Sequence, residues 1–203
     1  QPKLKTLRAD LKKRGLGVYS RTEIERELLT EANRSRWNVQ DTTAPRFIRA
    51  MLQAEVLREV RFEFPHRDIV RYVFGSATEY ELVQSIRPDG YFSHFTAMRL
   101  NDLTDQLPRT YFLNEEQAAS PGGGELAQDA IDRVFRRPGR VSNNTARFGD
   151  SQVTLLAGAN TGKLGVVDLA DTSGSRIQTT SIERTLIDIA VRPVYSGGIF
   201  EVA

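Results

Sequence analysis

The sequence contains no cysteine and only two histidines, His66 and His94, among its 203 residues. The lack of cysteine excludes disulfides, thiolate zinc ligands and a cysteine nucleophile, and two histidines are too few for a multi-histidine metal site. No uncharged apolar run approaches the ~18 residues of a membrane-spanning helix. We therefore expect no metal, no cofactor and no membrane partner. Because missing cysteine fits a reducing compartment, we expect a cytoplasmic location.

The remaining composition is that of a globular protein, with 39% hydrophobic and 27% charged residues. The net charge of +2 hides an asymmetry. Residues 1–75 hold 16 basic and 10 acidic side chains, an excess of six positive charges. Residues 76–203 hold 12 and 16, an excess of four negative charges. Such asymmetry suggests a nucleic-acid-binding module joined to a second part; a basic face that only contacts solvent is the alternative.

Two helices are predicted near the start of the chain. Leu4, Leu7 and Leu11 recur at helical spacing, and Gly15 is a natural C-terminal stop. Residues 20–23 (Ser-Arg-Thr-Glu) form a capping box that begins a second helix, predicted to continue to about residue 35. Ile24, Leu28 and Leu29 supply its apolar face.

A third helix is predicted from Thr43, its N-cap, with Pro45 in the first turn, where a missing N–H costs nothing. Its predicted inward residues are Phe47, Ile48, Met51 and Leu52. The residues left on the outside are Thr42, Thr43, Arg46, Arg49 and Gln53. No acidic residue interrupts that outward face before Glu55.

Residues 56–64 and 69–74 are rich in Val, Phe and Tyr and are predicted strands, with a hairpin tip at residues 65–68. Three helices followed by a hairpin is the order of a winged helix-turn-helix. Arg46 and Arg49 would then face a DNA major groove, where arginine binds guanine or phosphate. Thr42 and Thr43 would bind phosphate through hydroxyl and backbone N–H groups, and His66 and Arg67 would extend from the wing. The alternative is a protein-binding module without DNA-binding activity.

Three further arginines, Arg58, Arg61 and Arg71, are either part of that DNA-binding surface or paired with the interleaved Glu59 and Glu63.

The rest of the chain predicts a short helix at residues 78–87, a turn at 88–90 and a helix capped by Ser93. Strands are predicted at residues 109–114, 152–157, 164–169 and 176–179, with a hairpin connection at 158–164 and a poorly ordered loop around 120–124. A capping box at 180–183 begins the last helix, whose predicted inner face is Leu186, Ile187 and Ala190 and which ends at Pro193. Glu183, Arg184 and Asp188 are expected to form a capping and ion-pair set.

No catalytic motif appears, so we expect no enzymatic activity. His94, beside Ser93, is the only candidate base of a rival hydrolase hypothesis, and a hydrogen-bonded role at a helix start is the simpler interpretation. One basic cluster interrupts the acidic part and is a candidate secondary patch for DNA phosphates or an acidic partner. It consists of Arg133, Arg136, Arg137 and Arg140.

Several segments together resemble the AbiEi family, the antitoxins of bacterial type IV toxin–antitoxin operons. They are residues 91–98 (YFSHFTAM), 103–108 (LTDQLP), 160–165 (NTGKLG) and 181–188 (SIERTLID), followed by Arg192-Pro193 and Gly197-Gly198. The resemblance covers essentially the whole chain.

The resemblance implies an α+β protein of two domains: a winged helix-turn-helix DNA-binding domain at residues 1–76 and a mixed α/β antitoxin domain at 77–203. It implies a repressor that binds its own double-stranded operator. Because half-sites mirror protein symmetry, we expect a homodimer on an inverted repeat, with one molecule on each of several repeats as the alternative. It also implies an abortive-infection (phage-defence) antitoxin that counteracts a nucleotidyltransferase toxin, with or without direct contact. Proteins of this family often continue with further helices beyond the position of Ala203, and Gln1 in place of Met predicts an earlier start.

Overall fold

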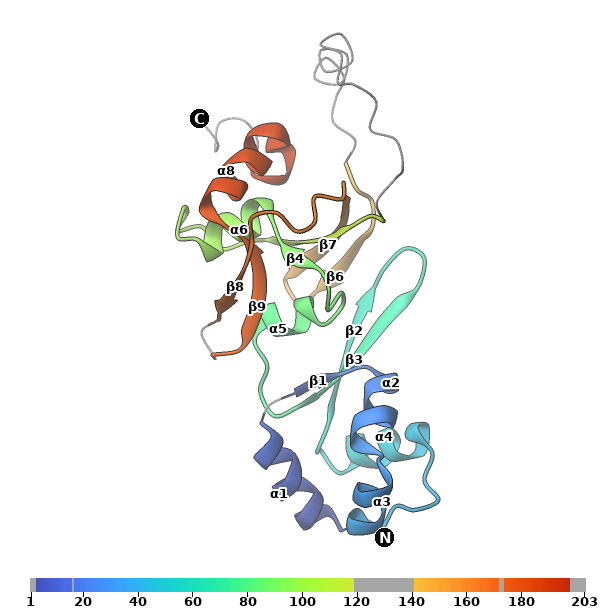
Figure 1. The fold of residues 1–203 in the computed structure, drawn as a ribbon. Coiled ribbons are helices and arrows are strands. Elements are labelled where there is room, and N and C mark those ends of the chain that lie inside the picture. Colours follow the sequence, from blue (N-terminus) through green and yellow to red (C-terminus); the bar gives the residue numbers. More distant parts are fainter. Residues whose placement is uncertain (1–2, 16, 119–140, 172–173, 198–203) are drawn as a thin grey trace. The chain divides into compact units, whose positions relative to one another are not determined.

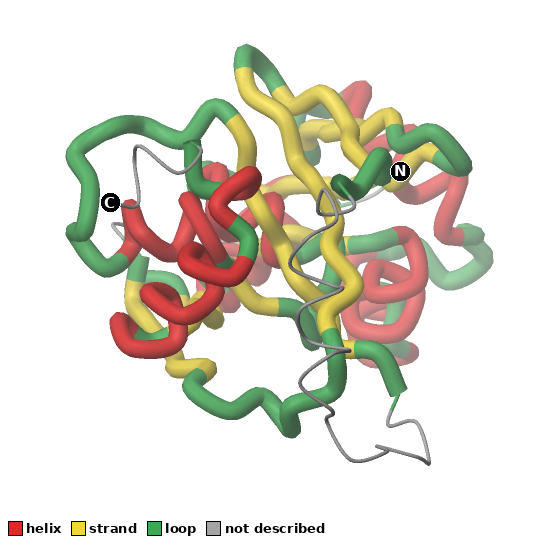
Figure 2. The backbone as a smooth tube through the Cα atoms, turned by 90° about the horizontal axis from the view of Figure 1, so that it is seen from above, coloured by secondary structure: helices red, strands yellow, loops and turns green. Residues whose placement is uncertain are grey.

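A computed structural model describes residues 3–15, 17–118, 141–171 and 174–197. The chain divides into two compact units, Gln1–Ile86 with Asp171–Ser175, and Arg87–Ala170 with Arg176–Ala203. Helices and strands both contribute, as the red and yellow segments of Figure 2 show, so the fold class is mixed α+β, as predicted. Within the described residues, no helix has the length and apolar character needed to cross a membrane.

The first unit contains four helices, a π-helical turn, a three-stranded sheet and a further short helix (Figure 1). In chain order these are α1 (Leu4–Arg14), β1 (Gly17–Tyr19), α2 (Arg21–Glu23), η1 (Ile24–Leu28, the π-helical turn), α3 (Glu31–Trp37), α4 (Ala44–Gln53), β2 (Arg58–Glu63), β3 (Asp68–Phe74) and α5 (Glu79–Gln84). The predicted domain boundary after residue 76 precedes α5, which groups with the first unit.

The predicted first helix and the capping box after it are confirmed. Gly15 follows α1 with a φ of 89°, a left-handed conformation that glycine adopts without strain. The backbone N–H of Ser20 donates to Glu23 Oε2 at 2.6 Å, and the N–H of Glu23 donates to Ser20 Oγ at 3.2 Å. Both bonds satisfy orphan donors at the start of α2.

The prediction of one helix from residue 20 to about residue 35 is wrong. The helix ends at Leu28, with Leu29 as its C-cap, and Thr30 caps a new helix, α3. Two side chains of α3 stabilise this break by satisfying the last carbonyls of the preceding helix: Asn33 Nδ2 donates to Leu28 O at 2.9 Å, and Arg34 Nε donates to Leu29 O at 2.7 Å.

The sheet of the first unit is antiparallel throughout, with strand order β1-β3-β2. The predicted hairpin is confirmed: β2 pairs with β3 from Arg58↔Val73 to Glu63↔Asp68, and residues 64–67 form the tip. Strand β1 was not predicted, because three residues give too short a pattern to identify.

A hydrophobic core lies beneath α4 and joins it to the other helices of the first unit. Its buried residues are Leu7, Leu11, Ile24, Leu28, Leu29, Trp37, Val39, Ala44, Phe47, Ile48, Met51, Val56 and Leu57. Tyr19, Tyr72 and Phe74 of the sheet pack against this cluster. The predicted inward residues of the helices therefore form a common core, with Leu52 only partly buried.

The second unit is built on a six-stranded mixed sheet with strand order β6-β7-β5-β4-β9-β8. Its elements are β4 (Tyr91–Phe92), α6 (His94–Leu100), β5 (Thr110–Glu116), β6 (Thr145–Phe148), β7 (Ser151–Gly158), β8 (Val166–Ala170), β9 (Arg176–Thr180), α8 (Ile182–Val191) and the 3₁₀ turn η2 (Pro193–Tyr195). The predicted strands correspond to β5, β7, β8 and β9, whereas the short β4 and β6 were not predicted. The predicted loop at residues 120–124 lies outside the described residues.

The prediction of a hairpin at residues 158–164 is wrong, because β7 and β8 are not neighbours: β5, β4 and β9 lie between them in the sheet. The segment crosses over instead and is held by the carboxylate of Glu116. The N–H of Thr161 donates to Glu116 Oε2 at 2.9 Å and the N–H of Lys163 at 3.2 Å, while the Thr161 hydroxyl also donates to this carboxylate. Burial acts to raise the pKa of Glu116, but these bonds outweigh it and lower the pKa to about 2.

The predicted start and inner face of the last helix are also wrong. Ser181, not Thr180, is the N-cap of α8, so no capping box with Glu183 forms. Leu186 and Ile187 are 50% and 59% exposed, and Ala190 is exposed as well.

Thr185 and Ile189 are buried on the inner face of α8 instead. The Thr185 hydroxyl is satisfied there, since it donates to Ser181 O at 2.7 Å and lies 2.8 Å from Thr180 Oγ1. A hydrogen-bonded threonine therefore faces the sheet at little desolvation cost. The predicted end of the helix before Pro193 is confirmed.

Two leucines of the first unit test the packing of its core. Leu28→Ala removes a fully buried side chain and is expected to lower the free energy of unfolding by about 2–5 kcal/mol. Leu4→Ala, at a side chain 36% exposed, is expected to cost less than half of that. Urea unfolding followed by Trp37 fluorescence measures both, because the only tryptophan of the chain lies in this core. Equal losses in the two variants would contradict the described packing.

Candidate nucleic-acid interface

Helix α4 is oriented by its buried face. Phe47, Ile48 and Met51 are buried in the core of the first unit. The ring of Phe47 stacks on Trp37 of α3, with ring centroids 6.2 Å apart and an interplanar angle of 15°. Since the aromatic rings and the apolar stripe fix the rotation of the helix, they determine which residues it presents to solvent.

Trp37 is in turn held by α1. Its indole Nε1 donates to Asp10 Oδ2 at 2.9 Å, and Arg36 donates to both carboxylate oxygens of Asp10, at 2.6 and 2.9 Å. These bonds hold the pKa of the Asp10 carboxyl below its usual range, with the Arg36 bond as the largest cause. One carboxylate thus joins α1 to α3, the helix on which α4 packs.

The turn between α3 and α4 is fixed by Arg34. Besides Leu29 O, its guanidinium donates to Gln40 O at 3.2 Å and to Thr42 O at 2.6 Å. Thr42 is half-buried, and its N–H donates to Val39 O at 3.1 Å. The backbone N–H of Thr42 is therefore already bonded within the turn.

The outward face of α4 carries the predicted residues Thr43, Arg46, Arg49 and Gln53, all of them exposed. Thr43 occupies the N-cap position but its side chain makes no capping bond, and Pro45 lies in the first turn as predicted. Within the part of the chain that the structure describes, neither Arg46 nor Arg49 forms an ion pair or a side-chain hydrogen bond.

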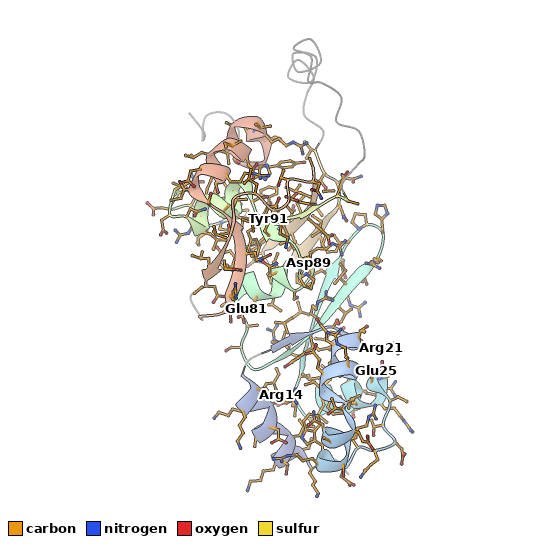
Figure 3. The ribbon with its side chains drawn as sticks, viewed as in Figure 1. Arg14, Arg21, Glu25, Glu81, Asp89 and Tyr91 are labelled. Carbon is orange, nitrogen blue, oxygen red and sulfur yellow. The ribbon has the colours of Figure 1, made fainter. Side chains whose placement is uncertain are left out.

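Several other arginines of the first unit, in contrast, bond to carboxylates or backbone carbonyls. Arg61 pairs with Glu59 at 3.1 Å and Asp68 at 2.9 Å, and Arg71 donates to Ser85 O at 2.7 Å. Arg14, at the end of α1 (Figure 3), donates to Glu27 O at 3.3 Å. Arg58 is the exception among the three interleaved arginines: it is exposed at the start of β2, with no ion pair among the described residues.

The tip of the β2–β3 hairpin carries the exposed His66 and Arg67. Residues 54–63 separate it from the end of α4, and six of them form β2, which is about 20 Å long at the rise of a strand. The predicted site residues therefore form two groups within the first unit: a helix face with Thr43, Arg46, Arg49 and Gln53, and a separate hairpin tip. The second predicted basic patch, Arg133, Arg136, Arg137 and Arg140, lies outside the described residues.

The candidate base of the second unit, His94, is buried at the start of α6 with a φ of 53°. Its Nδ1 lies 2.9 Å from Ser93 Oγ, and its ring packs edge-on against Tyr195, with centroids 5.1 Å apart. Burial, with the positive charges of Arg192 and Arg184 as further causes, lowers the pKa of His94 to about 4. The predicted hydrogen-bonded role at a helix start is confirmed, as is the Arg184–Asp188 ion pair at 2.9 Å.

A comparison of the sequence with protein-family models finds no matching model, and a comparison with curated proteins finds no match.

The low pKa of His94 predicts a defined loss of stability in acid. Because an unfolded histidine binds a proton near pH 6.5 and folded His94 near 4, stability is full above 6.5 and falls as the pH drops from 6.5 towards 4, by roughly 3 kcal/mol. We expect an imidazole NMR titration of His94 with a midpoint near 4. His94→Asn, which tolerates the left-handed backbone, should flatten that part of the stability profile. A midpoint near 6.5 would contradict the described burial.

Proposed function

We propose that the first unit is a winged helix-turn-helix that binds double-stranded DNA. Helix α4 is the recognition helix, the β2–β3 hairpin is the wing, and α1 and β1 complete the domain. The order of helices and strands and the antiparallel β1-β3-β2 sheet support this proposal. DNA-binding domains of this kind place one helix in the major groove and use flanking elements to contact the backbone.

The observation that carries the proposal is the unpaired arginines on α4. Arg34 and Arg36 donate to backbone carbonyls and to Asp10, whereas Arg46 and Arg49 have no partner among the described residues. The guanidinium group makes two parallel hydrogen bonds to guanine, and it also pairs with phosphate. Two such groups one turn apart, on a helix face without acidic residues, are complementary to DNA.

The start of α4 adds a second kind of contact. No side chain caps its first turn, so backbone N–H groups at this end are available for a phosphate oxygen. Arg58 follows α4 closely, and His66 and Arg67 extend from the wing. In this arrangement α4 reads the bases, while Thr43, Arg58 and the wing contact the backbone.

Combined Arg46→Ala and Arg49→Ala substitutions test the recognition helix. We expect the affinity for the DNA upstream of the gene to fall at least about tenfold, and the slope of log affinity against log salt to become shallower by about 1–2. A mobility-shift titration at several salt concentrations measures both.

The matched control is Lys12→Ala combined with Lys13→Ala, which removes the same charge from the exposed end of α1. Trp37 fluorescence verifies that each variant is folded. Undiminished DNA binding by the Arg46/Arg49 variant, or an equal loss in the lysine control, would show that α4 is not the recognition helix. If the unaltered protein binds no DNA, the first unit is a protein-binding module instead.

We further propose that the chain is an autorepressor and antitoxin of a type IV toxin–antitoxin operon in the bacterial cytoplasm. The segments that resemble the AbiEi family support this, and all of them belong to the second unit. The antitoxin activity is accordingly assigned to the second unit, and nucleotidyl transfer to the toxin. No catalytic role is assigned to His94, whose burial and bond to Ser93 suit a structural role.

The two proposed activities are separable in the same variant. Arg46→Ala with Arg49→Ala changes only the first unit, so it is expected to lose repression of a promoter reporter and to keep protection against the toxin. Growth of cells that co-express the chain with a type IV nucleotidyltransferase toxin, the proposed partner, measures protection. Failure of the unaltered chain to restore growth would remove the antitoxin proposal, and loss of both activities in the variant would contradict their division between the units.

A further inference from the structure

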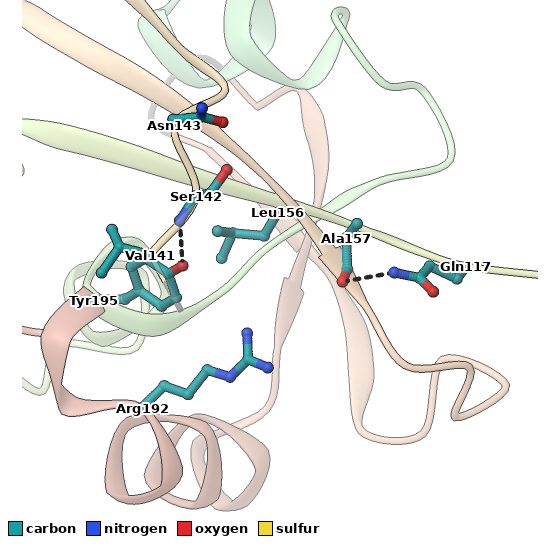
Figure 4. A pocket seen from close by; sticks show the side chains of 8 residues that line it. All are labelled: Gln117, Val141, Ser142, Asn143, Leu156, Ala157, Arg192 and Tyr195. Carbon is teal, nitrogen blue, oxygen red and sulfur yellow. Dashed lines mark hydrogen bonds between the residues drawn. The ribbon is translucent and has the colours of Figure 1, made fainter. Parts of the chain in front are cut away.

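Two adjoining hollows lie in the second unit, outside the proposed DNA-binding surface. One has a volume of about 380 Å³ and the other about 170 Å³. Both are lined by Leu156 of β7 and by Arg192, the residue that follows α8. The two hollows are therefore neighbours, and we refer to them together as the Arg192 groove. Figure 4 shows the larger part, with the Arg192 side chain extending from the end of α8.

The walls of the Arg192 groove are fixed by the sheet. Strands β5 and β7 run parallel and bring Asn114 and Gly158 together at their carboxyl ends. Gly158 lets the Asn114 amide lie close to the backbone of β7, because a Cβ atom at Gly158 would lie 2.8 Å from Asn114 Nδ2 and displace that side chain. On the other side, Tyr195 Oη accepts a hydrogen bond from the N–H of Ser142 at 2.8 Å (Figure 4).

The charge of the groove is positive. Arg184 and Asp188 both line it and neutralise each other in an ion pair of 2.9 Å. Arg192 is exposed, and its guanidinium has no partner among the described residues. The groove thus has one uncompensated positive charge, in the position of a pairing group for a bound anion.

The remaining polar groups of the groove are uncharged and suit hydrogen bonds to the uncharged part of a bound ligand. His94 lines the smaller hollow and, with a pKa of about 4, is uncharged at neutral pH. Gln117, whose Nε2 donates to Ala157 O at 3.3 Å (Figure 4), and Asn143 line the larger hollow, and Leu156 supplies apolar surface there. A combined volume of several hundred Å³, apolar surface and a few convergent polar groups characterise small-molecule sites.

We propose that the Arg192 groove binds a small organic anion, whose carboxylate or phosphate group pairs with the Arg192 guanidinium and whose polar body contacts the amides of Gln117 and Asn143. The left-handed backbone of His94 is a second sign of a binding site, since residues held in sparsely populated conformations cluster where ligands bind. This inference is independent of the proposed DNA binding.

NMR titration of the ¹⁵N-labelled full chain tests the proposal. The probes are acetate, inorganic phosphate and adenosine 5′-monophosphate, with uncharged adenosine as the ligand control. We expect saturable shifts of the Arg192 side-chain Nε–H and of the backbone amides of Asn114, Gly158 and Gln117 with at least one anion, at a dissociation constant of about 1 mM or tighter. Saturation by the phosphates alone assigns a phosphate ligand, and saturation by acetate alone assigns a carboxylate.

The decisive variant is Arg192→Ala, with Arg147→Ala as its matched control. Arg147 is an exposed arginine of β6 that lines neither hollow. Arg192→Ala is expected to weaken binding at least about tenfold, because it removes a charged hydrogen-bonding partner, and Arg147→Ala is expected to bind as the unaltered chain does. The proposal is overturned if no anion gives saturable shifts, if adenosine binds as well as its monophosphate, or if Arg192→Ala binds undiminished.

Discussion

The orientation of α4 depends on the stacking of Phe47 on Trp37 and on the Asp10 carboxylate that holds Trp37 in place. Phe47 packs on Trp37, and Trp37 is held by its hydrogen bond to Asp10, which Arg36 also binds. These contacts join α1, α3 and α4, and the apolar face of α4 has only one way to be buried against them. Arg46 and Arg49 are consequently directed away from the core, so the proposed recognition surface is a product of how the core is packed.

In the second unit, hydrogen bonds between polar side chains and backbone fix the rotation of α8. The hydroxyls of Thr180 and Thr185 lie 2.8 Å apart, and Asn101 Nδ2 donates to Thr180 O at 2.9 Å, so the inner face of α8 is anchored by hydrogen bonds as well as by Ile189. This anchoring turns Leu186 and Ile187 outward, and Arg192 at the end of α8 lines the same hollows as Leu156 of β7. The same rotation brings Arg184, Asp188 and Arg192 to the groove lined by Leu156, which is the proposed anion site.

Several helix starts and ends that depend on residues close in sequence were predicted correctly. Features that depend on side chains from other parts of the chain were not. Leu4 to Leu11, the Ser20–Glu23 box and Pro45 located their helices, since caps and periodicity act within a few residues. The break at Leu29 was missed because it depends on Asn33 and Arg34 folding back onto the preceding turn. The crossover after Gly158 and the inner face of α8 depend on Glu116 and Asn101, partners distant in sequence. Of the candidate site, the exposure of Arg46 and Arg49 followed from periodicity, whereas the groove around Arg192 had no sequence signal.

The central claim is that α4 enters the major groove of DNA, and chemical-shift mapping tests it most directly. ¹⁵N-labelled protein is titrated with duplex DNA from the region upstream of the gene, and the backbone amides of all assigned residues are followed. The account predicts that the largest perturbations fall on residues 43–53 of α4 and on residues 64–67 of the wing tip. Perturbations confined to other elements, such as α1 or the second unit, with α4 unchanged at saturation, would contradict it.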